Sequence, residues 1–404
     1  MKRLWTIMLI IGLVSVLGWM PSTAQASNLT DACVSDYDAE VDYFPHKVDV
    51  QDAENFTVEY FNHYKVVTVT DAFDGAEPFT YVLTQCGTPT PAVADFPDNT
   101  QFIDVPAADI IAMSTTQLPP LNDLGLVDNL VGLDTFTFVN TPAIRERIDN
   151  DELVAIGSGT EVNVERVLEM EPDIVMTYGF DPSSDAYPIL IDAGIFTALD
   201  ASWREPTPLA RAEWLTYIAL FYNQEQAANT IYENIVTQYN DARELAATVP
   251  ADEQPVVLVN AFSSFSETWL IPGADTYVGT LINDAGGQVA LADQAPDDSI
   301  SLSFETIYSG ALDADIWITN VFGLRSVEGL TDIDARYADF APVATGNVWN
   351  NNLDVNANGG NNYFELGVTN PHLILQDLVA LFHPELLPDH DFNFYRPLTP
   401  TADE

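Results

Sequence analysis

The sequence predicts an α/β protein of two lobes that one long helix joins, with an antiparallel β extension in front of the first lobe. Three observations favour this fold. Strand-like alternation fills residues 41–86, short buried runs alternate with helical patterns on both sides of the chain centre, and residues 209–247 contain no glycine or proline. Buried runs that alternate with helices are typical of parallel sheets with crossover helices.

The extension, residues 27–104, is expected to form an antiparallel sheet. Residues 56–60 and 66–70 alternate apolar and polar side chains, and residues 79–83 form a third strand-like run after a turn. The pattern then changes at a Thr-Pro repeat near residue 90. The extension is therefore expected to differ in fold class from the α/β remainder of the chain.

Residues 105–205 and 250–404 are expected to form the two α/β lobes. Each contains short apolar runs of the length of buried strands, separated by helical patterns. These runs cover residues 110–113, 130–133, 174–176, 195–196, 256–259 and 316–318. The lobes should therefore each contain a parallel sheet.

Residues 206–249 are expected to form the interlobe helix. Apolar side chains recur there at spacings of three and four, and prolines bound the segment at both ends. The segment forms one helix or two nearly collinear ones. At 1.5 Å per residue, 39 helical residues span roughly 58 Å, longer than one small lobe.

The two lobes repeat a local pattern. Asn163 stands two residues before Glu165, Ser303 stands two residues before Glu305, and in both lobes a strand that starts with Asp-Ile follows. The capping side chains would satisfy free amides of the first helical turn, where a glutamate lies favourably in the helix dipole. A purely structural role for the glutamates explains the pattern equally well at this point.

The composition excludes several classes of partner. The 404 residues include 13 Lys and Arg against 61 Asp and Glu, which gives a formal net charge of −48. So few cations cannot assemble the basic surface that nucleic acid or anionic lipid requires. Hydrophobic residues make up 47% of the chain, enough to fill a core. We therefore expect a folded acidic monomer that binds no nucleic acid.

The first 26 residues have the parts of a secretory signal. Lys2 and Arg3 precede an apolar run that reaches residue 20, and a small-residue motif ends at Ala26, where cleavage is expected. An uncleaved anchor is the alternative, although about 17 apolar residues are short for a membrane span. The mature chain is therefore expected to be secreted, either periplasmic or on the outer face of the cell membrane.

The chain contains two cysteines, Cys33 and Cys86. In an oxidising compartment an isolated pair most simply forms one disulfide, which would tie the extension to the end of a strand. Two free buried thiols are the alternative. No motif around either cysteine indicates a catalytic thiol.

Taken together, the motifs resemble the substrate-binding proteins of ABC importers for iron-siderophores and cobalamin, the helical-backbone class III type. The resemblance covers roughly residues 105 to 390. It rests on Ser114-Thr115-Thr116-Gln117-Leu118-Pro119, Leu124-Gly125, Leu130-Val131-Gly132, the run from Gly157 to Glu165, Glu171-Pro172-Asp173-Ile174-Val175, Glu213-Trp214, Ala285-Gly286-Gly287 and Phe304-Glu305.

The resemblance implies two Rossmann-like α/β lobes joined by one long rigid helix, with the ligand in the cleft between them. It also implies a partner, because a glutamate of each lobe in this family docks onto arginines of the membrane permease. By motif those positions are Glu165 and Glu305 here. The resemblance implies binding and delivery, so neither enzyme activity nor a cofactor is expected.

The shortage of cations narrows the expected ligand. An iron-catecholate complex is strongly anionic and needs several cations, but only Arg204, Arg325 and Arg336 fall in regions expected to face the cleft. Less charged hydroxamate or citrate complexes need mainly aromatic walls. We therefore expect an iron-siderophore complex, with cobalamin, another corrinoid or haem as the alternative.

Six cleft residues are predicted. Tyr178 and Trp269 are favoured because loops after parallel strands are where such sheets bind ligands. For each aromatic residue, ordinary core packing is the alternative. The predicted residues are Tyr178, Trp203, Arg204, Trp269, Arg325 and Trp349.

Other functions have weaker support. The five histidines lack the spacing of a metal cluster, so no metal site is expected. No Gly-x-Ser-x-Gly elbow is present, which leaves a secreted hydrolase as a minor alternative. A wall-associated structural protein is a further alternative that the N-terminal sheet suggests. The histidines are His46, His63, His372, His383 and His390.

Overall fold

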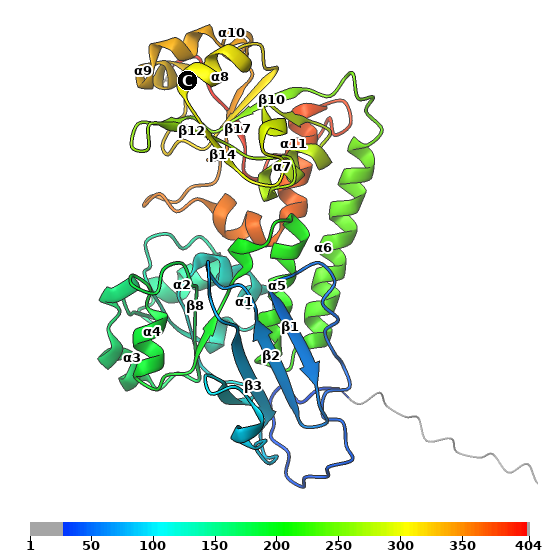
Figure 1. The fold of residues 1–404 in the computed structure, drawn as a ribbon, viewed down its shortest axis with the longest axis vertical. Helices are drawn as coiled ribbons and strands as arrows, with labels where there is room; N and C mark the ends of the chain where they lie inside the picture. Colours follow the sequence, from blue (N-terminus) through cyan, green and yellow to red (C-terminus); the bar gives the residue numbers. More distant parts are fainter. Residues whose placement is uncertain (1–26, 402–404) are drawn as a thin grey trace, which may run out of the picture.

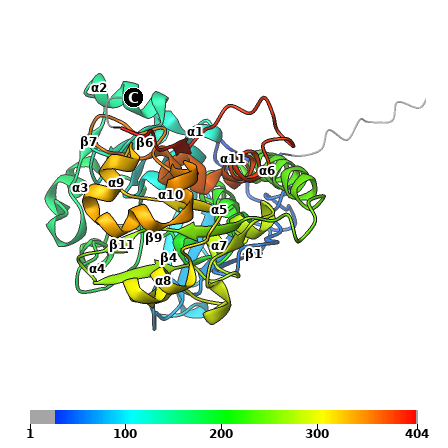
Figure 2. The same ribbon diagram turned by 90° about the horizontal axis from the view of Figure 1, so that it is seen from above.

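The computed structural model describes residues 27–401, so the expected signal sequence, residues 1–26, lies outside the described residues. Two α/β lobes are stacked along the long axis of the molecule, and the long helix α6 (Glu225–Ala246) runs beside both (Figure 1). Figure 2 shows α6 at one edge of the molecule, with the lobes to one side. The predicted fold class is confirmed.

The N-terminal segment forms a four-stranded sheet in the order β1-β2-β3-β4. Its strands are β1 (Phe56–Tyr60), β2 (Tyr64–Val69), β3 (Phe79–Gln85) and β4 (Gln101–Val105). The first three strands pair antiparallel as expected, whereas β4 pairs parallel to β3. The predicted disulfide between Cys33 and Cys86 is present and ties the start of the segment to the end of β3.

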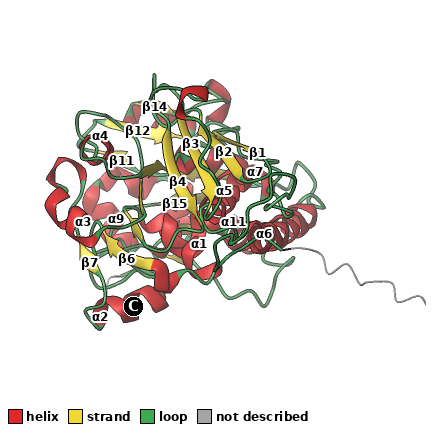
Figure 3. Ribbon diagram, turned by 90° about the horizontal axis from the view of Figure 1, so that it is seen from below, coloured by secondary structure: helices red, strands yellow, loops and turns green. Residues whose placement is uncertain are grey.

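The N-terminal sheet shares one hydrophobic core with the first lobe. Phe56 packs against Trp214 with ring centroids 4.9 Å apart, and Tyr81 packs edge-on against Phe221. Viewed from below, strands β1 to β4 lie beside α5 (Pro208–Leu220) (Figure 3). The extension is therefore fused to the first lobe by packing.

Buried glutamates reinforce this junction. Glu213 accepts hydrogen bonds from the backbone N–H groups of residues 51–53 at 2.7 to 2.8 Å. Glu205 accepts from the N–H groups of residues 54 and 55 and from the indole of Trp214 at 2.9 to 3.1 Å. Burial raises the pKa of both carboxyl groups. Each carboxylate therefore holds a segment of the extension beside α5 through several hydrogen bonds.

The first lobe contains a five-stranded parallel sheet in the order β7-β6-β5-β8-β9. This order has the first strand in the centre and is that of a doubly wound sheet. Its elements are β5 (Ile110–Ala112), α1 (Leu118–Asp123), β6 (Leu130–Leu133), α2 (Pro142–Asp149), β7 (Val154–Ala155), α3 (Val164–Met170), β8 (Ile174–Thr177), α4 (Tyr187–Asp192) and β9 (Thr197–Leu199).

The second lobe contains a five-stranded sheet in the order β13-β10-β15-β16-β17, parallel except for the edge strand β17, and a small antiparallel sheet β11-β12-β14. Its elements are β10 (Val256–Val259), β11 (Phe262–Ser263), β12 (Thr268–Ile271), α7 (Tyr277–Asp284), β13 (Gln288–Val289), β14 (Ile300–Leu302), α8 (Phe304–Gly310), β15 (Ile316–Thr319), α9 (Val327–Ile333), α10 (Ala341–Thr345), β16 (Val348–Asn350), α11 (Pro371–Phe382) and β17 (Arg396–Pro397).

The aspartates of the repeated Asp-Ile motif have equivalent structural roles. Asp173 accepts a 2.6 Å hydrogen bond from the N–H of Ala108, just before β5. Asp315 accepts a 2.8 Å bond from the N–H of Val256, at the start of β10. Each aspartate therefore fixes two neighbouring strand starts of its lobe.

The interlobe segment, expected to form one helix or two nearly collinear ones, forms two helices that lie against each other. The α5 helix packs against α6, and Asn223 in the turn between them has a left-handed backbone with φ of 55°. The longer bridge is α6, whose 22 residues span about 33 Å, and α5 also contacts α7 and α11 of the second lobe. Tyr232 belongs to the core of the first lobe and Tyr239 to that of the second, so one helix is packed into both.

Candidate ligand-binding cleft

The loops that follow the parallel strands of both lobes meet in one cleft. In the first lobe, cleft residues follow β5, β6, β8 and β9, and in the second lobe they follow β15 and β16. The carboxyl ends of parallel strands are where open α/β sheets bind ligands. The two sheets therefore direct equivalent edges toward a shared site.

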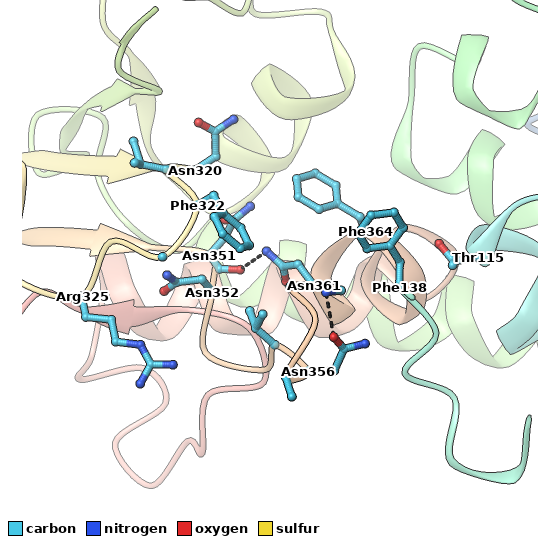
Figure 4. Close-up of a pocket in the computed structure, with 16 residues that line it drawn as sticks. Thr115, Phe138, Asn320, Phe322, Arg325, Asn351, Asn352, Asn356, Asn361 and Phe364 are labelled. Atoms are coloured by element: carbon cyan, nitrogen blue, oxygen red, sulfur yellow. Dashed lines mark hydrogen bonds between the residues drawn. The ribbon is translucent and has the colours of Figure 1, made fainter. Parts of the chain in front are cut away.

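The cleft contains two adjoining cavities that share Phe364. The larger cavity, about 440 Å³, is lined by residues of both lobes, including Phe138 and Phe322. The smaller cavity, about 310 Å³, is lined mainly by the first lobe and the start of α5. Figure 4 shows Phe322, Phe364 and Phe138 grouped around the larger cavity, with Arg325 set apart from them.

Exposed aromatic side chains make up most of the apolar lining. Single exposed aromatic residues are common, but several that gather in one concave patch mark a binding site. Their exposed fractions are 38% for Tyr178, 67% for Phe180, 38% for Trp203, 50% for Phe138, 79% for Phe322 and 50% for Phe364. The cleft is therefore suited to a large ligand with flat or apolar faces.

The polar groups of the smaller cavity are few. Asp200 is buried and accepts a 2.9 Å bond from the N–H of Ser202, and burial raises its pKa. Burial likewise raises the pKa of Tyr178, which faces the negative charges of Asp134 and Asp185. Arg211 contributes a guanidinium. The cavity thus combines aromatic walls with one cation.

Hydrogen bonds from the second lobe close one side of the cleft. Glu365, in the one-turn π-helical segment η8 (Tyr363–Gly367), accepts from the backbone and side chain of both Asn140 and Thr141. Asn356 donates to the carbonyls of Thr137 and Val139 at 3.3 and 3.1 Å. These bonds join residues more than 200 positions apart in the sequence and fix the lobes on that side.

Three of the six predicted cleft residues lie at the cleft. Tyr178 and Trp203 line the smaller cavity, and Arg325 lines the larger one. Tyr178 follows β8 directly, and Trp203 lies in the short 3₁₀ turn η5 (Ser202–Arg204) after β9. The structure therefore brings the two aromatic residues together and places the arginine across the cleft.

The predictions for Trp269 and Trp349 were wrong. Trp269 is fully buried in β12, where its indole packs against Trp317 and donates a 2.7 Å bond to the carbonyl of Val259. Trp349 packs against Phe392 at the opposite edge of the sheet, beside residues that precede β10 and β15. Core packing occupies the indole of Trp269, and Trp349 lies with residues that precede the strands, away from the strand ends that form the cleft.

The prediction for Arg204 was also wrong. Its guanidinium forms ion pairs with Asp71 and Asp74 of the N-terminal segment at 2.8 and 2.9 Å. Arg336, expected near the cleft, pairs with Asp334 and stacks over the ring of Phe304. Neither charge is free for a ligand, because local carboxylates neutralise it.

Several cleft residues were missed by the sequence reasoning. Phe138 and Phe322 lie in loops after the buried runs of β6 and β15, so the rule that selected Tyr178 would also have selected them. Arg211 was missed because it lies within a helical pattern. No local signal marks Phe364, which follows an asparagine-rich loop.

Glu165 and Glu305 occupy equivalent positions on the two lobes. Each is exposed and is the second residue of its helix, α3 or α8. The side chains of Asn163 and Ser303 cap those helices as expected. Both helices lie on the side of the molecule away from α6 (Figures 1 and 2). The two carboxylates are thus accessible to a partner.

Two further features bear on function. Among residues 27–401, no helix combines the length and apolar character that a membrane crossing needs. Within that range, no group of three or more His, Cys, Asp or Glu side chains is arranged to hold a metal ion.

Two α/β lobes, a bridging helix and an aromatic cleft at the strand ends define a two-lobe solute-binding protein. The periplasmic binding protein family matches residues 110–335, more than half of the chain. The chain belongs to this family, which confirms the family that its motifs indicate. Proteins of this family bind solutes and are not enzymes.

Relatives and solved structures agree with this assignment. An uncharacterized lipoprotein of Methanocaldococcus jannaschii is 23% identical over 311 residues, which cover 74% of this chain and 70% of that protein. An uncharacterized ABC transporter substrate-binding lipoprotein of Bacillus subtilis is 25% identical over 173 residues, 42% of this chain and 51% of that protein.

Two heme-binding proteins are among the similar structures. The periplasmic heme-binding protein RhuT from Roseiflexus sp. RS-1 has a TM-score of 0.50 at 20% identity and covers 69% of this chain and 99% of its own. A periplasmic heme-binding protein from Pseudomonas aeruginosa has a TM-score of 0.52 at 18% identity, with 73% and 100% covered. At these identities the likeness shows the shared fold.

Proposed function

We propose that this protein captures an iron-siderophore complex outside the cytoplasmic membrane and delivers it to the permease of an ABC importer. The observation that carries the proposal is the aromatic cleft between the lobes, where six accessible rings surround two adjoining cavities. Aromatic walls with a few polar groups suit a bulky chelate of low charge. The name of the Bacillus subtilis relative supports a role in import.

The charge of the cleft favours a hydroxamate complex over a catecholate complex. Arg211 and Arg325 are the basic residues that line the two cavities, one in each. A complex with three negative charges would meet too few cations to replace its lost hydration. The iron ion is cargo and keeps its own ligands within the chelate.

Haem is the second candidate, with cobalamin as a related tetrapyrrole. A flat ring system would stack between faces such as those of Phe322 and Phe364, which line the same cavity. Two of the similar structures are heme-binding proteins by name. Haem or cobalamin would bind in the same cleft and would be delivered to the permease in the same way.

Delivery would use the paired carboxylates of Glu165 and Glu305. Two anionic groups at fixed positions on the two lobes give register and steering to a docking partner with arginines. Because α6 is packed into both lobes, capture is expected to involve only modest lobe movement.

Ligand identity is tested by tryptophan fluorescence and calorimetry with a ferric trihydroxamate, ferric citrate, a ferric tricatecholate, haemin and cobalamin. Saturable binding of the trihydroxamate complex is expected, with much less quenching in Trp203→Phe. The control is Trp349→Phe, which changes an indole outside the cleft. Exclusive binding of the tricatecholate would contradict the charge argument, and turnover of a probe would contradict a binding role.

A further inference from the structure

Carboxylates neutralise most cations of the described chain. Arg211 and Arg325 line the interlobe cavities and form no ion pair with any residue among 27–401. The cations that do form ion pairs with Asp or Glu are Lys47, Lys65, Arg145, Arg147, Arg166, Arg204 and Arg336. Arg243 and Arg396 also form no ion pair within residues 27–401, but neither lines these cavities, so it is the unpaired guanidinium inside the cleft that points to an anion.

Arg211 is held rigidly at the edge of the smaller cavity. It lies in the first turn of α5, and its Nε donates a 3.0 Å bond to the carbonyl of Glu205. Its guanidinium lies over the ring of Tyr277, 4.1 Å from the ring centroid. Packing thus restrains the guanidinium at the cavity lining, and its two terminal nitrogens donate no hydrogen bond to any of residues 27–401.

The nearest carboxylates are already engaged. The carboxylate of Glu205 accepts from Glu54, Asn55 and Trp214, on the side of the N-terminal segment. Asp200 lines the same cavity but accepts from Ser202, and burial favours its protonated form by raising its pKa. Burial also lowers the pKa of Arg211, because the nearby charge of Glu205 only partly offsets the hydration that the guanidinium has lost.

The other groups that line the smaller cavity suit a carboxylate, the anion that a guanidinium would bind. Hydroxyl groups of Ser114, Thr116 and Ser202 line it beside the aromatic walls. A planar fork of N–H donors binds a carboxylate through two parallel hydrogen bonds, and hydroxyls can donate to the remaining lone pairs. A volume of about 310 Å³ admits a side arm of a ligand whose body fills the larger cavity.

We propose that Arg211 is the anion-recognition residue of the cleft and that the ligand carries a carboxylate, which enters the smaller cavity and pairs with this guanidinium. The inference rests on the proposed function, because it assumes that the cleft holds the transported chelate. It specifies the ligand further: a mostly apolar body with a carboxylate arm.

The test compares probes that differ only in their carboxylates. One pair is haemin and its dimethyl ester, and the other is a linear ferric trihydroxamate with a free terminal carboxylate and its methyl amide. The wild-type protein is expected to bind the acid form of its preferred pair about 100-fold more tightly than the neutral form, because a buried charge-assisted pair is lost in the latter. This comparison needs no variant and is independent of folding defects.

Variants then assign the preference to one residue. Arg211→Gln is expected to bind the acid form as weakly as the neutral form, and Arg211→Lys to retain part of the preference. Arg243→Gln, an exposed position on α6 that lines no described cavity, is the matched control and should keep the full preference. Thermal unfolding checks that all variants are folded.

The outcomes separate the two proposals. If no probe binds the wild-type protein, the proposed function fails and this inference fails with it. If probes bind but acid and neutral forms bind equally, or if Arg211→Gln keeps the preference, the inference is overturned while the proposed function stands.

Discussion

Glu365 of the second lobe holds Thr141 of the first: its Oε1 accepts both the backbone N–H and the hydroxyl of Thr141 at 2.6 Å each. The glutamate is 1% exposed, and its second oxygen accepts from Asn140. One side chain thus satisfies four donors of the opposite lobe. The two lobes are therefore connected at the cleft itself as well as through α6.

Replacement of Glu365 by Ala is expected to lower the free energy of unfolding by about 2 to 4 kcal/mol, because buried donors of Asn140 and Thr141 lose their partner. Urea denaturation measures this change. The control is Glu385→Ala, which alters an exposed glutamate of the same lobe and should be nearly neutral. Equal stability of the two variants would show that the interlobe bonds add nothing.

The ion pair of Lys65 and Glu225 ties the N-terminal sheet to the start of α6 at 2.7 Å, with both side chains fully buried. Replacement of Lys65 by Met should destabilise the protein by about 3 to 5 kcal/mol, since it leaves Glu225 charged and uncompensated. The double variant Lys65→Met with Glu225→Leu should recover much of this loss. Lys47→Met, which breaks a half-exposed pair, should cost less than about 1 kcal/mol. Chemical denaturation of the wild type and the three variants measures these differences in the free energy of unfolding.

Asp134 predicts a pH dependence of stability. Burial raises its pKa from 3.8 to about 6, so the folded state binds the proton more tightly than the unfolded state. The stabilisation of the folded state by this proton binding is therefore fully present below pH 4 and is lost as the pH rises through 6. Asp134→Asn, which stays neutral, should be more stable than wild type at pH 7 by between about 1 and 3 kcal/mol.

The gain from Asp134→Asn should vanish below pH 4, where the carboxyl group is protonated in both states. Thermal unfolding at pH 3.5 and pH 7 measures the difference. Asp128→Asn changes an exposed aspartate of the same lobe and serves as the control. A gain that does not vary with pH would point to packing or hydrogen bonding instead of ionisation.

Docking is tested by reversing the charge of Glu165 and Glu305 together. Uptake of the ligand by cells should be lost, while its affinity for the purified protein stays at the wild-type value, because both side chains are exposed and line none of the described cavities. The double variant Glu233→Lys with Glu385→Lys makes the same change of charge at other exposed sites and should transport normally. Weaker ligand binding with normal transport would contradict the assignment.

Local patterns predicted most of the strands but only part of their pairing. Burial alternates along β2, because each strand side faces either the core or the surface, and the sequence follows it at Val67, Thr68 and Val69 but not at the buried Lys65. The parallel pairing of β4 with β3 was not predictable, since the chain between them carries no signal of its direction. The break between α5 and α6 was missed because Asn223, and not Gly or Pro, adopts the left-handed conformation there.

A site residue could be predicted from the sequence where its position directly after a strand decides where it lies. Tyr178 could be placed because it follows a parallel strand, whereas Trp269 follows the same rule in the sequence and yet fills the core. Its environment is set by Trp317, Phe304 and Tyr337, which are distant in the chain. Whether a given ring meets ligand or core therefore depends on long-range neighbours.

The fusion of the N-terminal sheet to one lobe breaks the near-symmetry of the molecule. The core that includes Phe56 and Trp214 makes the N-terminal sheet part of the first lobe, and the second lobe has no counterpart among the described residues. The two lobes therefore offer unequal surfaces to any partner that contacts both. The two orientations that twin lobes would otherwise permit are no longer equivalent.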